Sequence, residues 1–122
     1  MIIGIGTDIV EVERVRELVE RWGERFLKRL FTDNELSYCF RFRDPVPHLA
    51  ARIAVKEAVF KCMGRRMVIR WRDLDIKSEE GVPSVALYGE IQRLADNIAV
   101  RRVHVSISHT DKLAMAIAVA EG

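Results

Sequence analysis

Apolar residues recur along the chain with two periods, and together these predict a mixture of strands and helices. The β-branched run at residues 2–6 predicts a short buried strand, with Asp8 just past its end. Residues 9–22 carry apolar side chains at helical spacing, which predicts an amphipathic helix interrupted at Gly23 and followed by one or two turns up to Leu30.

The next segment carries a recognisable helix start signal. Thr32 stands three residues before Glu35, the spacing of a capping box, which predicts a helix reaching about Phe42. Pro45 and Pro47 then predict a loop, because proline removes a backbone donor and restricts the residue before it.

Residues 48–63 form the strongest predicted helix, which ends at Gly64. Its apolar residues cover most of the circumference, as is typical of a helix buried in a core or an interface. Glu57 and Lys61 lie four residues apart within this apolar surface. An ion pair at the helix surface is the ordinary interpretation of such a pair, but a buried charge is costly unless it is paired or binds an ion.

The second half of the chain alternates with the period of strands. Residues 74–77 and 84–87 predict a hairpin with Pro83 at its start or edge, residues 90–98 a short helix, and residues 103–119 a second hairpin. This order predicts an α+β fold, in which a mostly antiparallel sheet packs against the long central helix. We expect one domain spanning residues 1–122.

Composition narrows the possible functions. The chain has 122 residues, 31% of them charged, with a formal net charge of +2, which is too small for a nucleic-acid-binding surface covering the whole molecule. No apolar run approaches the ~20 residues of a membrane span, and the first residues do not resemble a signal peptide. Cys39 and Cys62 belong to no metal-binding motif, so we expect reduced thiols and a cytoplasmic protein.

Several short patterns of polar residues have ordinary explanations. Asp8 can cap the following helix or point into a cleft, and capping is the commoner role. Gly4-x-Gly6 lacks the third glycine of a dinucleotide fingerprint. Residues 106–109 combine serines with a histidine but lack a nucleophile elbow, and the few histidines make a zinc site improbable.

A stripe of arginines follows the first predicted helix. Arg14, Arg21 and Arg25 are separated by seven and four residues, and Leu18 and Trp22 lie beside them. Most charged stripes are simply solvated helix faces. A basic stripe bordered by apolar residues is also suited to docking an acidic helix.

A second basic cluster supports an alternative function. Arg65, Arg66, Arg70 and Arg72 are candidates for a nucleic-acid-binding surface, which predicts strongly salt-dependent binding. The small net charge and the lack of an aromatic platform argue against this alternative, and a catalytically silent assembly module is a third hypothesis.

Four segments, in the same order along the chain, resemble the motifs of one enzyme family. They are Gly4-Ile5-Gly6-Thr7-Asp8-Ile9, Phe31-Thr32-x-x-Glu35, Ala51-Arg52-Ile53-Ala54-x-Lys56-Glu57-Ala58-x-x-Lys61 and Ser106-Ile107-Ser108-His109-Thr110. The family is that of the holo-[acyl-carrier-protein] synthases, the short 4′-phosphopantetheinyl transferases. The resemblance covers residues 1 to about 119 and implies the fold of that family.

The resemblance also implies a reaction. In this family, a serine hydroxyl of apo acyl carrier protein attacks the β-phosphate of coenzyme A, and adenosine 3′,5′-bisphosphate leaves. It implies that Asp8 and Glu57 are carboxylate ligands of Mg²⁺, and that Lys61 neutralises a phosphate oxygen. The base that accepts the serine proton stays open between Glu57, acting directly or through a water on the metal, and Glu35.

Further expectations concern the nucleotide, the protein partner and the assembly. Arg52, Gly64, Pro83, His109 and Thr110 match segments that contact coenzyme A in the family. The acyl carrier protein is expected to contact Arg14, Leu18, Arg21 and Arg25, and the family forms homotrimers with active sites at subunit interfaces. Many relatives have a second glycine shortly after the one matching Gly64, whereas Arg65-Arg66 stand here, so a backbone contact to phosphate is in doubt at this loop.

Overall fold

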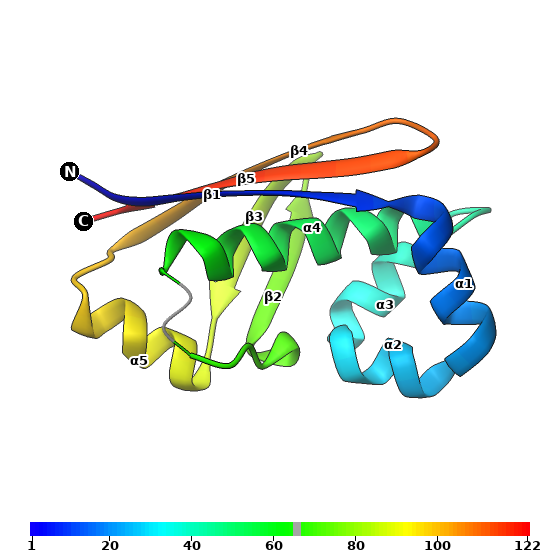
Figure 1. Cartoon of the computed structure of the whole chain (residues 1–122), viewed down its shortest axis with the longest axis horizontal. Helices are drawn as coiled ribbons and strands as arrows, with labels where there is room; N and C mark the ends of the chain where they lie inside the picture. The colour runs from blue at the N-terminus through cyan, green and yellow to red at the C-terminus, as the bar shows by residue number, and fades with distance from the viewer. Residues whose placement is uncertain (65–66) are drawn as a thin grey trace.

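One long helix, α4, organises the molecule (Figure 1). The computed structural model describes residues 1–64 and 67–122. The elements in chain order are β1 (Ile2–Glu11), α1 (Val12–Trp22), α2 (Glu24–Leu30), α3 (Asp33–Cys39), α4 (Val46–Cys62), the 3-10 helix η1 (Trp71–Asp73), β2 (Leu74–Glu79), β3 (Val82–Leu87), α5 (Gly89–Asn97), β4 (Arg102–His109) and β5 (Leu113–Glu121). The predicted α+β fold is confirmed.

The strands form two antiparallel sheets that pack against α4. The larger sheet has the order β1-β5-β4, and the smaller one is the β2-β3 hairpin. Figure 1 shows the three-stranded sheet lying along one side of α4, with α1, α2 and α3 at one end of the molecule and α5 at the other. Both predicted hairpins are therefore present, and α4 has a buried side against each sheet.

Small residues allow β1 and β5 to approach the backbone of α4 closely. A Cβ atom at Gly4 would lie 2.0 Å from the carbonyl oxygen of Cys62, and one at Gly6 would lie 2.0 Å from that of Ala58. On β5, alternate residues are buried alanines: Ala114, Ala116, Ala118 and Ala120. The glycines of the first strand thus set the distance between β1 and the helix.

The first strand is longer than predicted. The prediction of a helix over residues 9–22 is wrong for residues 9–11, because β1 continues through Asp8 to Glu11 and α1 begins only at Val12. Pairing with β5 extends to Glu11 opposite Leu113, which satisfies the backbone groups of this segment as a strand. Asp8 is therefore a strand residue and not a helix cap.

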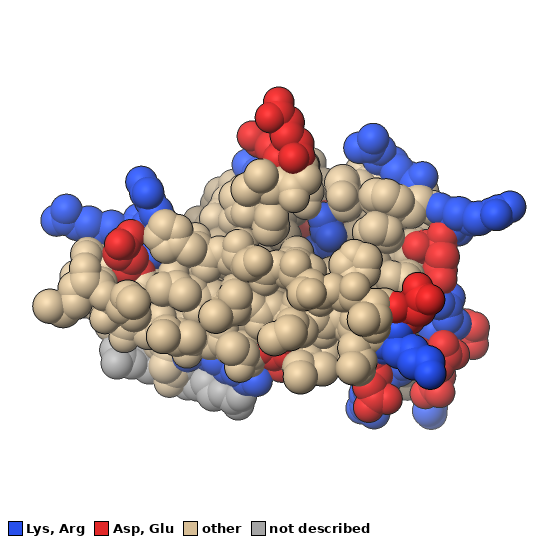
Figure 2. Space-filling view, turned by 90° about the horizontal axis from the view of Figure 1, so that it is seen from above, with Lys and Arg blue, Asp and Glu red and all other residues tan. Residues whose placement is uncertain are grey.

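The outer face of the three-stranded sheet is apolar and exposed. Ile5 is 58% exposed and Ile9 64%, so the prediction that the first strand is buried is wrong for a single chain. The other exposed apolar residues on these strands include Ile2, Ile3, Leu113, Met115 and Ile117. Figure 2 shows this face as a broad uncharged surface with charged residues gathered at its margins.

The helices agree with their predicted signals apart from their ends. Gly23, at a φ of 53°, separates α1 from α2, and Thr32 with Glu35 forms the predicted capping box. Helix α3 ends at Cys39, before the predicted Phe42. Helix α4 starts at Val46, earlier than predicted, because Pro47 is tolerated in the first turn of a helix.

No helix among residues 1–64 and 67–122 is long and apolar enough to cross a membrane. Cys39 and Cys62 are both buried free thiols, and burial raises the pKa of each to about 11. Burial therefore disfavours the thiolate, which is the nucleophilic form of cysteine.

Candidate active site

Three of the predicted site residues lie together between β1 and α4. The Nζ atom of Lys61 donates hydrogen bonds to Oδ1 of Asp8 at 3.0 Å and to the carbonyl oxygen of Thr7 at 2.9 Å. Asp8 is in the middle of β1, and Lys61 is in the last turn of α4. Glu57, one turn before Lys61, lines the same groove as both.

This groove, which we call the site groove, has a volume of about 1170 Å³. It lies between β1, α4, the first two helices and the turn between β4 and β5; Arg14, Leu18, Phe26, Leu30, Ile53, Trp71 and Leu113 are among its lining residues. Glu57 and Lys61 are half-buried and not enclosed in the core, and the partner of Lys61 is Asp8. The sequence pattern predicted that these two charges lie within an apolar helix surface. The pattern does not show that this surface opens into a groove.

The arginine stripe lies beside the site groove. Arg14 lines the groove, and all three of its arginines are exposed. The guanidinium carbons of Arg21 and Arg25 lie 5.1 and 5.9 Å from the ring centre of Trp22. A smaller side hollow of about 500 Å³ adjoins the stripe; its lining residues are Leu18, Trp22, Arg25, Phe26, Arg29 and Leu30.

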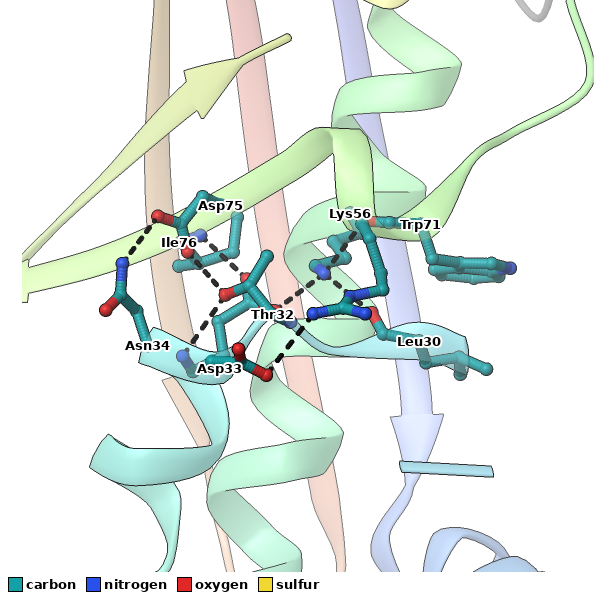
Figure 3. Close-up of polar contacts among 10 residues, drawn as sticks. Leu30, Thr32, Asp33, Asn34, Lys56, Trp71, Asp75 and Ile76 are labelled. Atoms are coloured by element: carbon teal, nitrogen blue, oxygen red, sulfur yellow. Dashed lines mark hydrogen bonds and ion pairs between the residues drawn. The ribbon is translucent and has the colours of Figure 1, made fainter. Parts of the chain in front are cut away.

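A buried ion pair between α4 and α3 was not predicted. The Nζ atom of Lys56 lies 2.7 Å from Oε1 of Glu35, and neither side chain has any exposed surface. Lys56 also donates to the carbonyl oxygens of Leu30, at 2.7 Å, and Trp71, at 2.9 Å (Figure 3). Burial lowers the pKa of Lys56, and the carboxylate of Glu35 opposes that shift. The only sequence signal was a lysine placed on the apolar side of the helix.

Glu35 is fully engaged in this network. Its Oε1 also accepts from the backbone N–H of Thr32 at 2.8 Å, and its Oε2 accepts from the N–H of Ile76 at 2.7 Å. The hydroxyl of Thr32 donates to Asp75 at 2.6 Å, which ties the start of α3 to β2. Both carboxylate oxygens of Glu35 are buried and already accept hydrogen bonds, which favours Glu57 over Glu35 as the general base.

The residues expected to contact the nucleotide lie apart from Asp8. Arg52 is buried, donates to the hydroxyl of Ser78 at 2.9 Å and places its guanidinium carbon 4.3 Å from the ring centre of Tyr38. Its Nε atom is buried without a hydrogen-bond partner among the described residues. Pro83 pairs with Ser78 in the β2-β3 hairpin, next to Arg52.

His109 and Thr110 close the far end of β4. The His109 ring lies 6.2 Å from that of His48, which stacks on Phe42 at 3.6 Å. Burial and the positive charge of Arg52 lower the pKa of His48. The hydroxyl of Thr110 accepts from the N–H groups of Lys112 and Leu113 in the turn.

The predicted nucleotide contacts therefore do not gather at the site groove of one chain. None of Arg52, Pro83, His109 and Thr110 is among the described residues that line it. Gly64 does not line the groove either, but it follows α4 close to Lys61, and its N–H donates to the carbonyl oxygen of Lys61 at 3.0 Å. Its φ of 83° favours glycine.

The two carboxylates of the site groove suit a magnesium ion. Within the described parts of the chain, no three Asp, Glu, His or Cys residues are grouped as a protein-only metal cage would need. Magnesium is commonly bound by one or two carboxylates, with water and substrate phosphates completing its shell. Asp8 and Glu57 provide this donor set on one groove.

The alternative basic cluster receives little support. Arg65 and Arg66 lie outside the described residues, and Arg72 forms an ion pair with Asp33 at 3.3 Å. Arg70 is exposed and lines a shallow hollow with Arg29 and Arg72.

Known proteins share the sequence features and the fold of this chain. The family model of the 4′-phosphopantetheinyl transferase superfamily matches residues 4–118. The chain is 42% identical to the holo-[acyl-carrier-protein] synthase of Halothermothrix orenii, over 99% of this chain and 98% of that one.

Solved structures of holo-[acyl-carrier-protein] synthases have the same fold as this chain. The holo-[acyl-carrier-protein] synthase of Neisseria meningitidis superposes with a TM-score of 0.91 at 32% identity and covers 100% of both chains. The Helicobacter pylori enzyme, solved in complex with coenzyme A, superposes with a TM-score of 0.83 at 27% identity over 96% of this chain and 99% of that one. The chain belongs to the 4′-phosphopantetheinyl transferase superfamily and, within it, to the holo-[acyl-carrier-protein] synthases.

Proposed function

We propose that this chain transfers the 4′-phosphopantetheine group of coenzyme A to a serine of an apo acyl carrier protein. The observation that carries the proposal is the meeting of Asp8, Glu57 and Lys61 in one groove beside an arginine-lined helix. Two carboxylates and an ammonium suit a diphosphate with a divalent cation, and exposed arginines suit an acidic protein.

In the proposed reaction, the serine oxygen forms a bond to the β-phosphorus, and the bond from that phosphorus to the leaving adenosine 3′,5′-bisphosphate breaks. Asp8 and Glu57 would hold Mg²⁺, which neutralises charge on the diphosphate oxygens. Lys61 places a further positive charge at the groove, steered by its hydrogen bonds to Asp8 and Thr7.

Glu57 is the proposed acceptor of the serine proton. It lies on the same groove as Asp8 and Lys61, and it has no hydrogen-bond partner among the described residues, unlike Glu35. A general base must lie within hydrogen-bond reach of the proton it abstracts, and a partly exposed carboxylate on the groove wall is accessible to a substrate bound there.

The acyl carrier protein is proposed to dock on α1 and the start of α2, where Arg25 lies. Arg14 and Leu18 line the site groove, and Leu18 and Arg25 line the adjoining side hollow. This arrangement offers apolar contacts between positive charges, with Arg21 exposed beside them. Charge attraction of this kind mainly accelerates association and weakens as salt is added.

We further propose a homotrimer in which neighbouring subunits share each active site. The absence of Arg52, Pro83, His109 and Thr110 from the lining of the site groove supports this, because the groove of one chain then lacks the expected nucleotide contacts among its described residues. The exposed apolar face of the three-stranded sheet, with Ile5 and Ile9, supports contact between copies. The reaction is proposed to take place in the cytoplasm, where free thiols persist.

The activity is tested by incubating the purified protein with coenzyme A, Mg²⁺ and candidate apo acyl carrier proteins. Mass spectrometry should show one carrier serine heavier by a phosphopantetheine group. Glu57→Gln should abolish the transfer, while Glu90→Gln, a change of an exposed residue on α5, should retain it. Normal turnover by Glu57→Gln would exclude the proposed role of this carboxylate.

The shared site is tested by subunit mixing. Glu57→Gln lacks a groove residue, and His109→Ala lacks a nucleotide residue, so each variant alone should be inactive. If sites are shared, co-expression should restore activity at about a quarter of the sites by random assembly. Mixtures that stay as inactive as the separate variants would place the whole site within one chain.

A further inference from the structure

We propose that Lys56 is a positioning residue: it holds in place the wall of the site groove that contacts the acyl carrier protein. This inference rests on the proposed function of the groove. It concerns a residue that is fully buried and does not itself face the groove.

Lys56 joins three separate segments of the chain. Its ammonium donates to Glu35 at the start of α3, to the carbonyl oxygen of Leu30 at the end of α2, and to that of Trp71 at the start of η1. These contacts bridge 21, 26 and 15 residues of sequence respectively. An ammonium has three donors, so its hydrogen-bonding capacity is used completely.

Two of these partners carry groove residues. Leu30 and Trp71 both line the site groove, and Figure 3 shows their side chains pointing to the same side, away from Asp75 and Asn34. Lys56 binds the main-chain carbonyls of the same two residues. The buried ammonium therefore holds the backbone of both groove residues in position.

The part of the groove wall formed by Leu30 and Trp71 lies towards α1, the helix proposed to contact the carrier protein. Leu30 also lines the side hollow, together with Leu18 and Arg25, which are proposed to contact the carrier protein. Asp8 lies on β1 and Glu57 lies on α4. The ammonium of Lys56 binds Glu35, Leu30 and Trp71, so it is linked to these two carboxylates only through the backbone of α4. Loss of the tie is therefore expected to alter carrier-protein recognition more than coenzyme A binding.

Glu35 provides a matched control. Glu35→Gln removes the negative charge of the pair but leaves the Lys56 contacts to Leu30 and Trp71 in place. Lys56→Met removes all three contacts with little change in side-chain length. A buried pair is strongly destabilised by loss of either partner, so both variants should lose stability.

Steady-state kinetics with apo acyl carrier protein and coenzyme A, at a temperature where circular dichroism shows both variants folded, separate the two roles. Lys56→Met should raise the KM for the carrier protein at least tenfold and leave the affinity for coenzyme A with Mg²⁺, measured by calorimetry, within twofold. Glu35→Gln should keep the KM for the carrier protein within about threefold of the original.

Equal KM values in the two variants, or a loss of coenzyme A affinity as large as the rise in KM, would overturn the positioning role. If Lys56→Met does not fold, the double variant Lys56→Met/Glu35→Gln, which leaves no unpaired charge, carries the same expectation. If the double variant is also unfolded, Lys56 serves only the stability of the fold and the proposal is overturned. Absence of transfer by the unmodified protein would instead refute the proposed function itself.

Discussion

Lys61, in the last turn of α4, donates a hydrogen bond of 3.0 Å to Asp8, which lies 53 residues earlier on β1. The contact exists because Gly6, two residues before Asp8, allows the strand to approach the carbonyl oxygen of Ala58 on the helix. The candidate active site therefore depends on how closely a strand and a helix pack.

Replacement of Lys61 should separate catalysis from stability. Lys61→Met is expected to lower kcat by about 100-fold or more, since it removes a positive charge from the proposed site of phosphoryl transfer. The free energy of unfolding should fall by less than about 1 kcal/mol, because the ion pair is partly exposed. Kinetics and urea unfolding measure the two effects, with the exposed Lys77→Met as the control; an unchanged kcat would contradict the assignment.

Adding a methyl group at Gly6 should damage both fold and activity. The new Cβ of Gly6→Ala would lie 2.0 Å from a backbone oxygen of α4, so β1 must move. We expect a loss of at least about 2 kcal/mol in the free energy of unfolding, at the upper part of the range for overpacked sites. Gly81→Ala, where nothing lies within 4 Å, should lose only about 1 kcal/mol through its positive φ. Equal losses in urea unfolding would argue against close packing as the cause.

Charge reversal on α1 should weaken the encounter with the carrier protein. Arg14→Glu is expected to raise the KM for an acidic carrier protein by about tenfold at low salt, and to make the KM less sensitive to added salt. Arg93→Glu, on the exposed side of α5 at the opposite end of the molecule, is the matched control. If both variants showed the same KM, the effect would reflect net charge and not a docking surface.

The apolar sheet face should control assembly. Ile5→Glu places a charge on that face, where it would be buried between copies, and is expected to convert the proposed trimer to monomers. Light scattering measures the mass, and Val82→Glu, which changes an exposed apolar residue on the β2-β3 hairpin, is the control. A monomeric unmodified protein would refute the trimer.

The stability of the fold should depend on the protonation of His48. Burial lowers the pKa of His48 below the usual value of about 6.5, so the folded chain favours the neutral ring. The stabilising contribution is complete above pH 6.5 and is lost as the pH falls through the lowered pKa of the folded state. His48→Phe, which keeps a ring against Phe42, should therefore lose less stability between pH 7.5 and 5 than the original chain. Identical losses in thermal unfolding would show that other groups titrate there.

Local signals in the sequence predicted most elements correctly. The capping box at Thr32, the helix break at Gly23 and both hairpins are present because each depends on neighbours within a few residues. The end of β1 was wrong because Ile9 and its neighbours fit a helix equally well, and pairing with β5 decided between the two.

The sequence by itself determined the fold class, the family and the chemical types of the site residues, since motif spacing and hydrophobic period are properties of the chain alone. Tertiary structure decided which charges meet. It joined Lys61 to Asp8, buried Lys56 against Glu35, and placed Arg52 and His109 away from the site groove. These outcomes depend on contacts between segments distant along the chain, and the free energy of a charge depends on the partner and the burial that such contacts provide.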